Sequence, residues 1–220
     1  MLRGKDVLFR YVGSGKYSVI SKKYKRFFYS KSQNLFSFSN GISERAVVIG
    51  NDYMLDSINF LDGDVIIDCG ANIGDIIIPY SDIGCNIIAF EPNPFAFEVL
   101  NNRFKHFDHI QCIPKAVSTK NGVSKLFFHE NSDNDELLWS TGSSLFDTKV
   151  NVIKTKYINV ETVNLSEYIM SINSTVKVLK LDIEGEEINV INQLIDKNIH
   201  KNIENIVVET HEEKIPELKK

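Results

Sequence analysis

The stretch "VIIDCGANIGD", from Val65 to Asp75, joins an apolar run to an acidic residue and a glycine-containing loop. This order is typical of a buried strand that ends at a nucleotide-like ligand, where free amides of a following helix start hold a polar group. Dinucleotide-binding loops read G-x-G-x-x-G, whereas this one reads G-A-N-x-G. Because Ala71 and Asn72 stand where a diphosphate needs close backbone approach, the loop disfavours NAD. A tight structural turn is the alternative interpretation.

The composition is that of an ordinary folded protein. Its 220 residues suffice for one domain with a large core, and the hydrophobic share of 43% argues against disorder. No window approaches the ~20 apolar residues of a membrane span. The charged N-terminus lacks the apolar segment of a signal peptide, so we predict a cytoplasmic protein. The net charge of −4 argues against nucleic acid as the main partner.

Two regions differ in their sequence pattern. The first 45 residues or so alternate aromatic, β-branched and charged residues, which predicts short antiparallel strands. Helical spacing then begins at Ser43, a candidate N-cap. We therefore expect a small N-terminal β appendage, residues 1–45, and a main domain, residues 46–220.

Apolar strands alternate with helices in the main domain, which indicates a parallel sheet covered on both faces. This is the doubly wound α/β plan, whose ligands bind at the carboxyl ends of the strands. Pro79 predicts that the first helix is short or kinked. The predicted strands are residues 65–68, 86–90, 110–113, 176–183 and 203–210, and the predicted helices are 73–80, 94–104, 165–172 and 186–196. Two further strands, 124–130 and 156–163, flank a long polar loop.

A second acidic residue, Glu91, ends the second strand in "IIAFEPNP". In doubly wound folds this position accepts ribose hydroxyls, so an adenosyl group is implied. Pro92 and Asn93 follow as a turn placed to flank the base. A surface acidic residue without a ligand is the alternative.

Ionisable side chains gather at the ends of the last two predicted strands, in "KLDIEGEE" and "ETHEE". Asp182 ends one strand and Glu184 lies just beyond it, and Glu209 and His211 end the next. Because neighbouring parallel strands end at the same edge, we expect these four side chains to converge. Such groups are suited to aligning an acceptor hydroxyl and taking its proton, or to holding a divalent cation. No metal ion is predicted as a cofactor.

Different roles are expected within this group. His211 is the favoured base because its unperturbed pKa of about 6.5 leaves it largely neutral at cell pH. Asp182 is expected mainly to orient the cofactor, and Glu184 or Glu209 to align the acceptor. Two alternatives remain open: the carboxylates of "EGEE" stabilise a helix start, or His211 is an ordinary surface histidine.

Five motifs, "DCGANIGD", "FEPNP", "GSSLF", "VLKLDIEGEE" and "VVETH", together resemble the FkbM family of S-adenosylmethionine-dependent methyltransferases. The resemblance covers roughly residues 47–211. It implies a Rossmann-like methyltransferase fold and O-methylation, often of a sugar hydroxyl. Such folds usually continue with an antiparallel strand pair, which we expect to be missing beyond "HEEKIPELKK".

The resemblance also implies roles for individual residues. Asp68 through Gly74 are expected to face the methionine half of S-adenosylmethionine, and Glu91 the ribose. Ala116 and Val117 are expected to lie by the adenine. The full set of cofactor-binding residues is then Asp68, Gly70, Ala71, Asn72, Gly74, Glu91, Pro92, Asn93, Ala116, Val117 and Asp182.

The polar loop at residues 131–148 is the candidate acceptor lid. Trp139 is suited to stack on a sugar ring, and Ser143 and Ser144 are suited to bond its hydroxyls. We therefore predict an S-adenosylmethionine-dependent O-methyltransferase that acts on a sugar or glycan precursor in polysaccharide biosynthesis. The alternatives are a non-catalytic cofactor-binding module and an NAD-dependent enzyme that modifies sugar nucleotides.

Overall fold

A computed structural model gives the structure of the chain, and it describes residues 2–3, 7–13, 16–21, 25–30, 53, 55–81, 83–134 and 136–218. Its centre is a five-stranded parallel sheet with the strand order β12-β11-β5-β6-β7. The strands are β5 (Val65–Cys69), β6 (Asn86–Phe90), β7 (Ile110–Ile113), β11 (Val176–Leu181) and β12 (Ile203–Val208). All five predicted strands are present, although β11 and β12 each end two residues earlier than predicted, and the sheet is the predicted doubly wound α/β arrangement.

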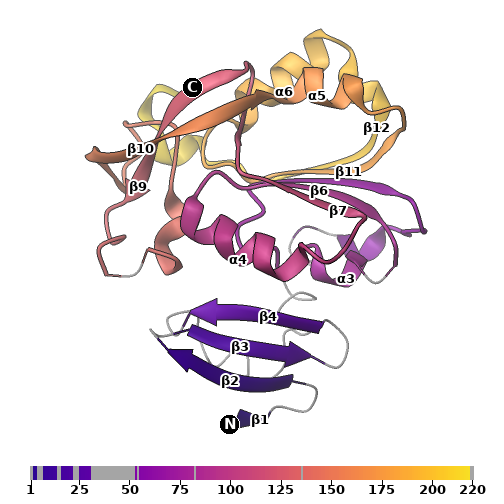
Figure 1. Cartoon of the computed structure of the whole chain (residues 1–220). Helices are drawn as coiled ribbons and strands as arrows, with labels where there is room; N and C mark the ends of the chain where they lie inside the picture. The colour runs from indigo at the N-terminus through magenta and orange to yellow at the C-terminus, as the bar shows by residue number, and fades with distance from the viewer. Residues whose placement is uncertain are drawn as a thin grey trace.

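Helices cover both faces of this sheet (Figure 1). On one face lie α3 (Ile78–Ser81) and α4 (Pro94–Phe104), and on the other lie α5 (Leu165–Ser171) and α6 (Glu187–Asp196). Successive strand residues point to opposite faces, so Ile66 and Ile67 belong to two different buried clusters. The sheet is therefore buried on both sides, as the near-continuous apolar strands predict.

The strand order reverses next to β5, because β6 and β7 follow on one side of it and β11 and β12 on the other. In doubly wound folds, the crevice outside the strand ends at such a reversal binds the ligand. Gly70 and Asp182 directly follow β5 and β11, so the loops after these two strands border that crevice.

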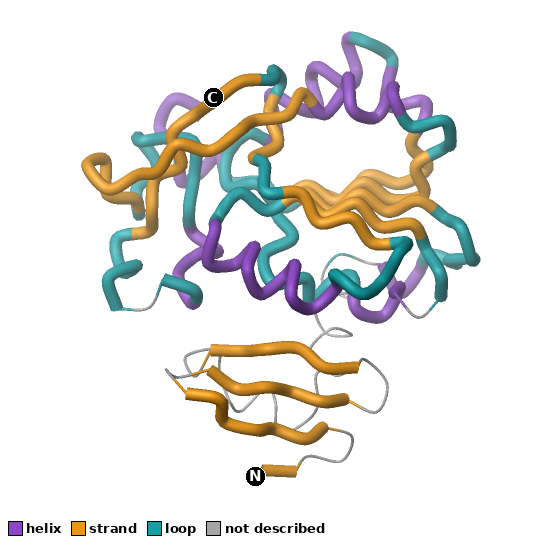
Figure 2. The backbone as a smooth tube through the Cα atoms, viewed as in Figure 1, coloured by secondary structure: helices purple, strands orange, loops and turns teal. Residues whose placement is uncertain are grey.

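A second, three-stranded sheet stands beside the first (Figure 2). The two strands predicted on either side of the polar loop are present as β9 (Gly122–His129) and β10 (Val152–Asn164), which pair antiparallel. The loop between them contains η2 (Leu138–Gly142), a 3-10 helix. The short strand β8 (Ala116–Ser118), parallel to β10, was not predicted because three residues are too few for a periodic pattern.

The N-terminal strands form a four-stranded antiparallel sheet in sequential order, which confirms the predicted strand type. They are β1 (Leu2–Arg3), β2 (Val7–Gly13), β3 (Lys16–Ser21) and β4 (Lys25–Ser30). The domain boundary at residue 45 and the predicted N-cap Ser43 lie outside the described residues. Where the description resumes, the chain forms the 3-10 turn η1 (Leu55–Ser57).

Short 3-10 turns also frame and follow β12. They are η3 (Ile199–Asn202), η4 (Glu212–Lys214) and η5 (Pro216–Leu218). Across the parts of the chain that the structure describes, no helix is both long and apolar enough to span a membrane.

The predicted helix at residues 73–80 is wrong at its start. Asn72 and Gly74 have φ values of 50° and 81°, which a right-handed helix does not contain. The chain therefore passes through turns before α3 begins at Ile78. The prediction of a short helix around Pro79 is confirmed.

Among the described glycines that follow β4, Gly70 has the least room for a side chain. Its φ is 77°, and a Cβ atom there would overlap the backbone carbonyl of Asp182. We expect Gly70→Ala to lower the free energy of unfolding by at least about 3 kcal/mol, because backbone strain and overlap add. Gly63→Ala is the control, since Gly63 has a φ of 84° but open space around its Cβ position. Gly63→Ala should lower the free energy of unfolding, measured by urea denaturation, by only about 1–2 kcal/mol. Equal losses in the two variants would contradict the importance of this close approach.

Candidate active site at the carboxyl edge of the sheet

A cavity of about 430 Å³ opens at the carboxyl ends of the central strands. This volume lies within the roughly 300–1,000 Å³ typical of small-molecule sites. Loops after β5, β6 and β11 form one wall, and residues of β8, β9 and η2 form another. The strand reversal, the predicted lid and the C-terminal segment therefore meet at one site.

Most of the predicted site residues line this cavity. Those that do are Gly70, Asn72, Glu91, Pro92, Ala116, Val117, Trp139, Ser143, Asp182, Glu184, Glu209 and His211. Asp68, Ala71, Gly74, Asn93 and Ser144 are not among the lining residues. The ionisable groups after β11 and β12 are thus brought together as predicted, and Glu91 lines the same cavity.

Glu91 joins two of the strand-end loops. It is 6% exposed, and its carboxylate accepts hydrogen bonds from the backbone amides of Asn72 at 2.8 Å and Asn93 at 2.7 Å. Burial raises the pKa of Glu91 to about 7, although the two amides and Lys180 act in the opposite direction. The Glu91 carboxyl group is therefore poised to change its charge near neutral pH.

The sequence pattern predicted that free backbone amides of the loop after β5 hold a polar group of the ligand. This prediction is wrong, because these amides already have partners within the protein. The amides of Gly70 and Ala71 donate to the carbonyl of Phe90 at 3.0 and 2.9 Å, and that of Gly74 donates to Ala71. With the Asn72 amide bonded to Glu91, these groups serve to shape the loop. The physical reason is that no helix begins in this loop. The loop therefore lacks the unpaired amides that the first turn of a helix would provide.

Asp68 lies beneath the cavity and contacts a buried lysine that sequence reasoning missed. The Lys180 ammonium is 3.2 Å from Asp68 Oδ1 and 3.4 Å from Asp182 Oδ2, and it donates to the Gly70 carbonyl at 2.9 Å. Burial disfavours the charge of Lys180, but Asp68 and Asp182 raise its pKa overall. Burial raises the pKa of Asp68, and Lys180 opposes this. The sequence could have indicated this network, because Lys180 is a charged residue inside the apolar run "VKVLKL".

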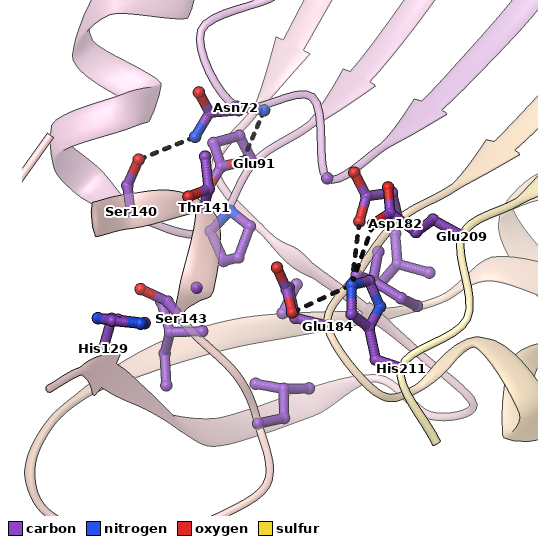
Figure 3. A pocket seen from close by; sticks show the side chains of 18 of the residues that line it. Asn72, Glu91, His129, Ser140, Thr141, Ser143, Asp182, Glu184, Glu209 and His211 are labelled. Carbon is purple, nitrogen blue, oxygen red and sulfur yellow. Dashed lines mark hydrogen bonds and ion pairs between the residues drawn. The ribbon is translucent and has the colours of Figure 1, made fainter. Parts of the chain in front are cut away.

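The predicted catalytic residues converge on one imidazole (Figure 3). His211 Nε2 lies 3.3 Å from Glu184 Oε2, 3.7 Å from Glu209 Oε1 and 3.9 Å from Asp182 Oδ1. The residue is 3% exposed, so the alternative of an ordinary surface histidine is wrong.

Glu187 holds the other side of this imidazole. Its carboxylate lies 3.0 Å from His211 Nδ1 and accepts hydrogen bonds from the amides of Ile183 and Gly185 at 2.9 Å. Burial lowers the pKa of His211, but Glu187, Glu184 and Asp182 raise it above its ordinary value overall. His211 was favoured as the base because its unperturbed pKa would leave the imidazole largely neutral at cell pH. The raised pKa removes this reason. The helix-start alternative applies in part, since Glu187 fixes the turn before α6.

The loop at Glu184 is held in an unusual conformation. Glu184 has a φ of 60°, which non-glycine residues adopt at a cost and chiefly at functional sites. The buried Lys149 ammonium donates to Glu184 Oε2 at 2.5 Å and to the Gly142 carbonyl at 2.9 Å. Ser144 donates to the Glu184 carbonyl at 2.6 Å, so Ser144 supports this loop. Burial raises the pKa of Glu184, against the effect of Lys149 and His211.

The predicted lid is tied to the strand-end loops at several points. Ser140 accepts a hydrogen bond from the Asn72 side chain at 2.8 Å, and Ser143 accepts one from Asn93 at 3.1 Å. Trp139 stacks on His129, with ring centroids 4.5 Å apart. One face of Trp139 is therefore covered by protein, while both rings belong to the cavity lining.

Tyr53 is a further site residue that sequence reasoning missed. Its hydroxyl lies 2.9 Å from Asp182 Oδ2 and 2.8 Å from Glu209 Oε2. Burial and these two carboxylates raise the pKa of Tyr53, so the phenol keeps its proton. The sequence gives no signal for it, because 129 residues separate Tyr53 from Asp182.

The sequence and the structure were compared with those of known proteins. The family model described as the Methyltransferase FkbM domain matches residues 68–219. Among solved structures, the fibrillarin pre-rRNA processing protein of Methanococcus jannaschii is 13% identical, with a TM-score of 0.40 over 98% of this chain and 81% of that one. Aeropyrum pernix fibrillarin, in complex with natively bound S-adenosyl-L-methionine, is 12% identical, with a TM-score of 0.38 over 92% of this chain and 74% of that one. No curated protein matches the sequence.

The buried Lys180 predicts a large stability effect. Lys180→Met should lower the free energy of unfolding by about 3–5 kcal/mol, because Asp68 would remain buried without its cation. The control is Lys177→Met on the same strand, where the Glu204 partner is 49% exposed. That exposed pair should be worth no more than about 1 kcal/mol. Urea denaturation measures both, and comparable losses would show that the network does not stabilise the strand ends.

Proposed function

The chain belongs to the FkbM family of S-adenosylmethionine-dependent methyltransferases, and from that premise we propose that it methylates a hydroxyl group of a sugar or glycan precursor. The observation that carries the proposal is the convergence of Asp182, Glu184, Glu209 and His211 in the cavity that Glu91 also lines. The proposal includes the cytoplasmic location and the role in polysaccharide biosynthesis expected from the sequence. Family membership excludes the alternatives of an NAD-dependent enzyme and a non-catalytic module.

The residues of the cavity fit S-adenosylmethionine. Gly70 leaves the strand end without a side chain, and Glu91 offers a buried carboxylate, the group that accepts ribose hydroxyls in doubly wound folds. Ala116 and Val117 supply a small apolar surface for the adenine. When bound, the cofactor supplies a methyl group activated by a sulfonium centre.

The carboxylate cluster supports a hydroxyl-bearing acceptor. Ionised carboxylates only accept hydrogen bonds, so they match the several donors of a sugar ring. Methyl transfer depends mainly on in-line alignment of the acceptor oxygen, which such multiple bonds provide. We assign the removal of the hydroxyl proton to Glu209, whose side chain is 54% exposed and thus the most accessible of the cluster.

The same cluster argues against a nucleic-acid acceptor. Several carboxylates beside the reacting centre repel phosphate groups, and the net charge of −4 gives no general attraction for a polyanion. Lys149 and Lys180 do not alter this conclusion, because both ammonium groups are buried and engaged with protein oxygens.

Radiolabelled methyl transfer from S-adenosylmethionine to separate panels of sugar nucleotides, neutral glycans and RNA tests the acceptor class. We expect labelling of a sugar substrate, with turnover lowered about 100-fold or more in Glu209→Gln because a positioned base contributes this much. Glu204→Gln, at an exposed carboxylate on β12, is the control and should retain full turnover. Labelling of RNA alone, or unchanged turnover in Glu209→Gln, would refute the assignment.

The pKa of Glu91 predicts a pH dependence of cofactor affinity. Ribose hydroxyls donate to the ionised carboxyl, so affinity should rise with pH until the group is ionised near pH 7. The dissociation constant of S-adenosylhomocysteine should therefore be about tenfold larger at pH 6 than at pH 8. Calorimetry at both values measures the change, and Glu91→Gln should abolish it. A variant that keeps the same pH dependence would place its origin elsewhere.

A further inference from the structure

We propose that Asp182, Glu184 and His211 bind one divalent metal ion of the Mg²⁺ and Mn²⁺ class at the inner end of the cavity. Its role would be to bind the acceptor hydroxyl, and this part alone rests on the proposed function. The ion-binding site itself is argued from the positions of the three side chains.

The distances between the candidate ligand atoms suit such an ion. One ligand atom from each residue lies within 4.8 Å of the other two. His211 Nε2 lies 3.3 Å from Glu184 Oε2 and 3.9 Å from Asp182 Oδ1. Around an octahedral ion with bonds of about 2.1 Å, neighbouring ligand atoms are about 3 Å apart and opposite ones about 4.2 Å. Both distances fall between these limits, so binding requires only small side-chain movements.

The orientation of the buried His211 imidazole also suits metal binding. The residue is 97% buried, as its exposed fraction is 3%, and Nδ1 is fixed by Glu187. Histidines that bind metals usually donate the other ring N–H to a carboxylate in this way. Its Nε2 points toward the carboxylates of Glu184, Glu209 and Asp182, at 3.3, 3.7 and 3.9 Å (Figure 3). A divalent ion between this nitrogen and the carboxylates would take the place of the Nε2 proton.

The charges around the cluster also call for a cation. The nearby carboxylates belong to Asp68, Asp182, Glu184, Glu187 and Glu209, whereas the buried ammonium groups among the described residues belong to Lys149 and Lys180.

The consequence for the acceptor follows from coordination chemistry. Three protein ligands leave positions of an octahedral ion open toward the cavity. A hydroxyl oxygen bound there has a lower pKa, as a metal-bound water has. Glu209, which the three ligands do not include, remains available to take the proton.

Titration of the full chain with Mn²⁺, followed by electron paramagnetic resonance, tests the site directly. We expect one ion per chain with a micromolar dissociation constant, and pulsed spectra of the unmodified protein should show coupling of Mn²⁺ to an imidazole nitrogen. His211→Ala and Asp182→Asn should each weaken binding at least tenfold. His129→Ala, which removes a histidine from the opposite cavity wall, should leave Mn²⁺ affinity unchanged.

Two results would overturn the site: no binding up to millimolar Mn²⁺, or binding without nitrogen coupling that survives in His211→Ala. The spectra of the unmodified protein keep the test valid even where a variant folds poorly. S-adenosylhomocysteine binding and sugar methylation, measured on the same samples, separate the two hypotheses. Methylation without Mn²⁺ binding refutes the metal site alone, whereas Mn²⁺ binding with methylation only of RNA refutes the acceptor class and leaves the site standing.

Discussion

The buried ammonium group of Lys180 holds together the two strand ends on which the site is built. It bonds the Gly70 carbonyl and lies between the carboxylates of Asp68 and Asp182. A buried charge is tolerated only when such partners replace water. Because one Asp182 oxygen faces Lys180 and Tyr53, the other faces the cavity. The backbones of Gly70 and Asp182 also approach each other closely, which explains why only glycine fits at position 70.

The parts of the fold set by local pattern could be predicted from the sequence. Residues 94–104 form the predicted helix because Pro94 opens it and the Asn93 side chain caps it, accepting from the Phe95 amide. The acids Glu91, Asp182 and Glu209 could be placed together because each follows a parallel strand, and parallel strand ends meet at one edge. Neither inference needs contacts between side chains that are distant in the sequence.

The other parts of the site depend on contacts between residues far apart in the sequence, which sequence patterns do not indicate. Tyr53 and Lys149 reach the residues around His211 from segments without any periodic signal. Glu187 resembles an ordinary helix-start carboxylate until its contact with His211 is seen. Asp68 shows a subtler limit. It stands one residue before the end of β5, so its side chain meets Lys180 inside the sheet, where the cavity does not reach.

An excess of carboxylates suits the charge changes of methyl transfer from a sulfonium. The reaction starts with one positive charge on the methyl donor and ends with one proton left at the site. A negative cluster favours positive charge in both places, so it need not rearrange between them. The same field penalises an acceptor whose phosphate lies near the reacting hydroxyl. In the metal-free site, a sugar nucleotide would therefore have to place its diphosphate away from Asp182, Glu184 and Glu209. Lys214 is an exposed residue of the cavity lining that could meet it.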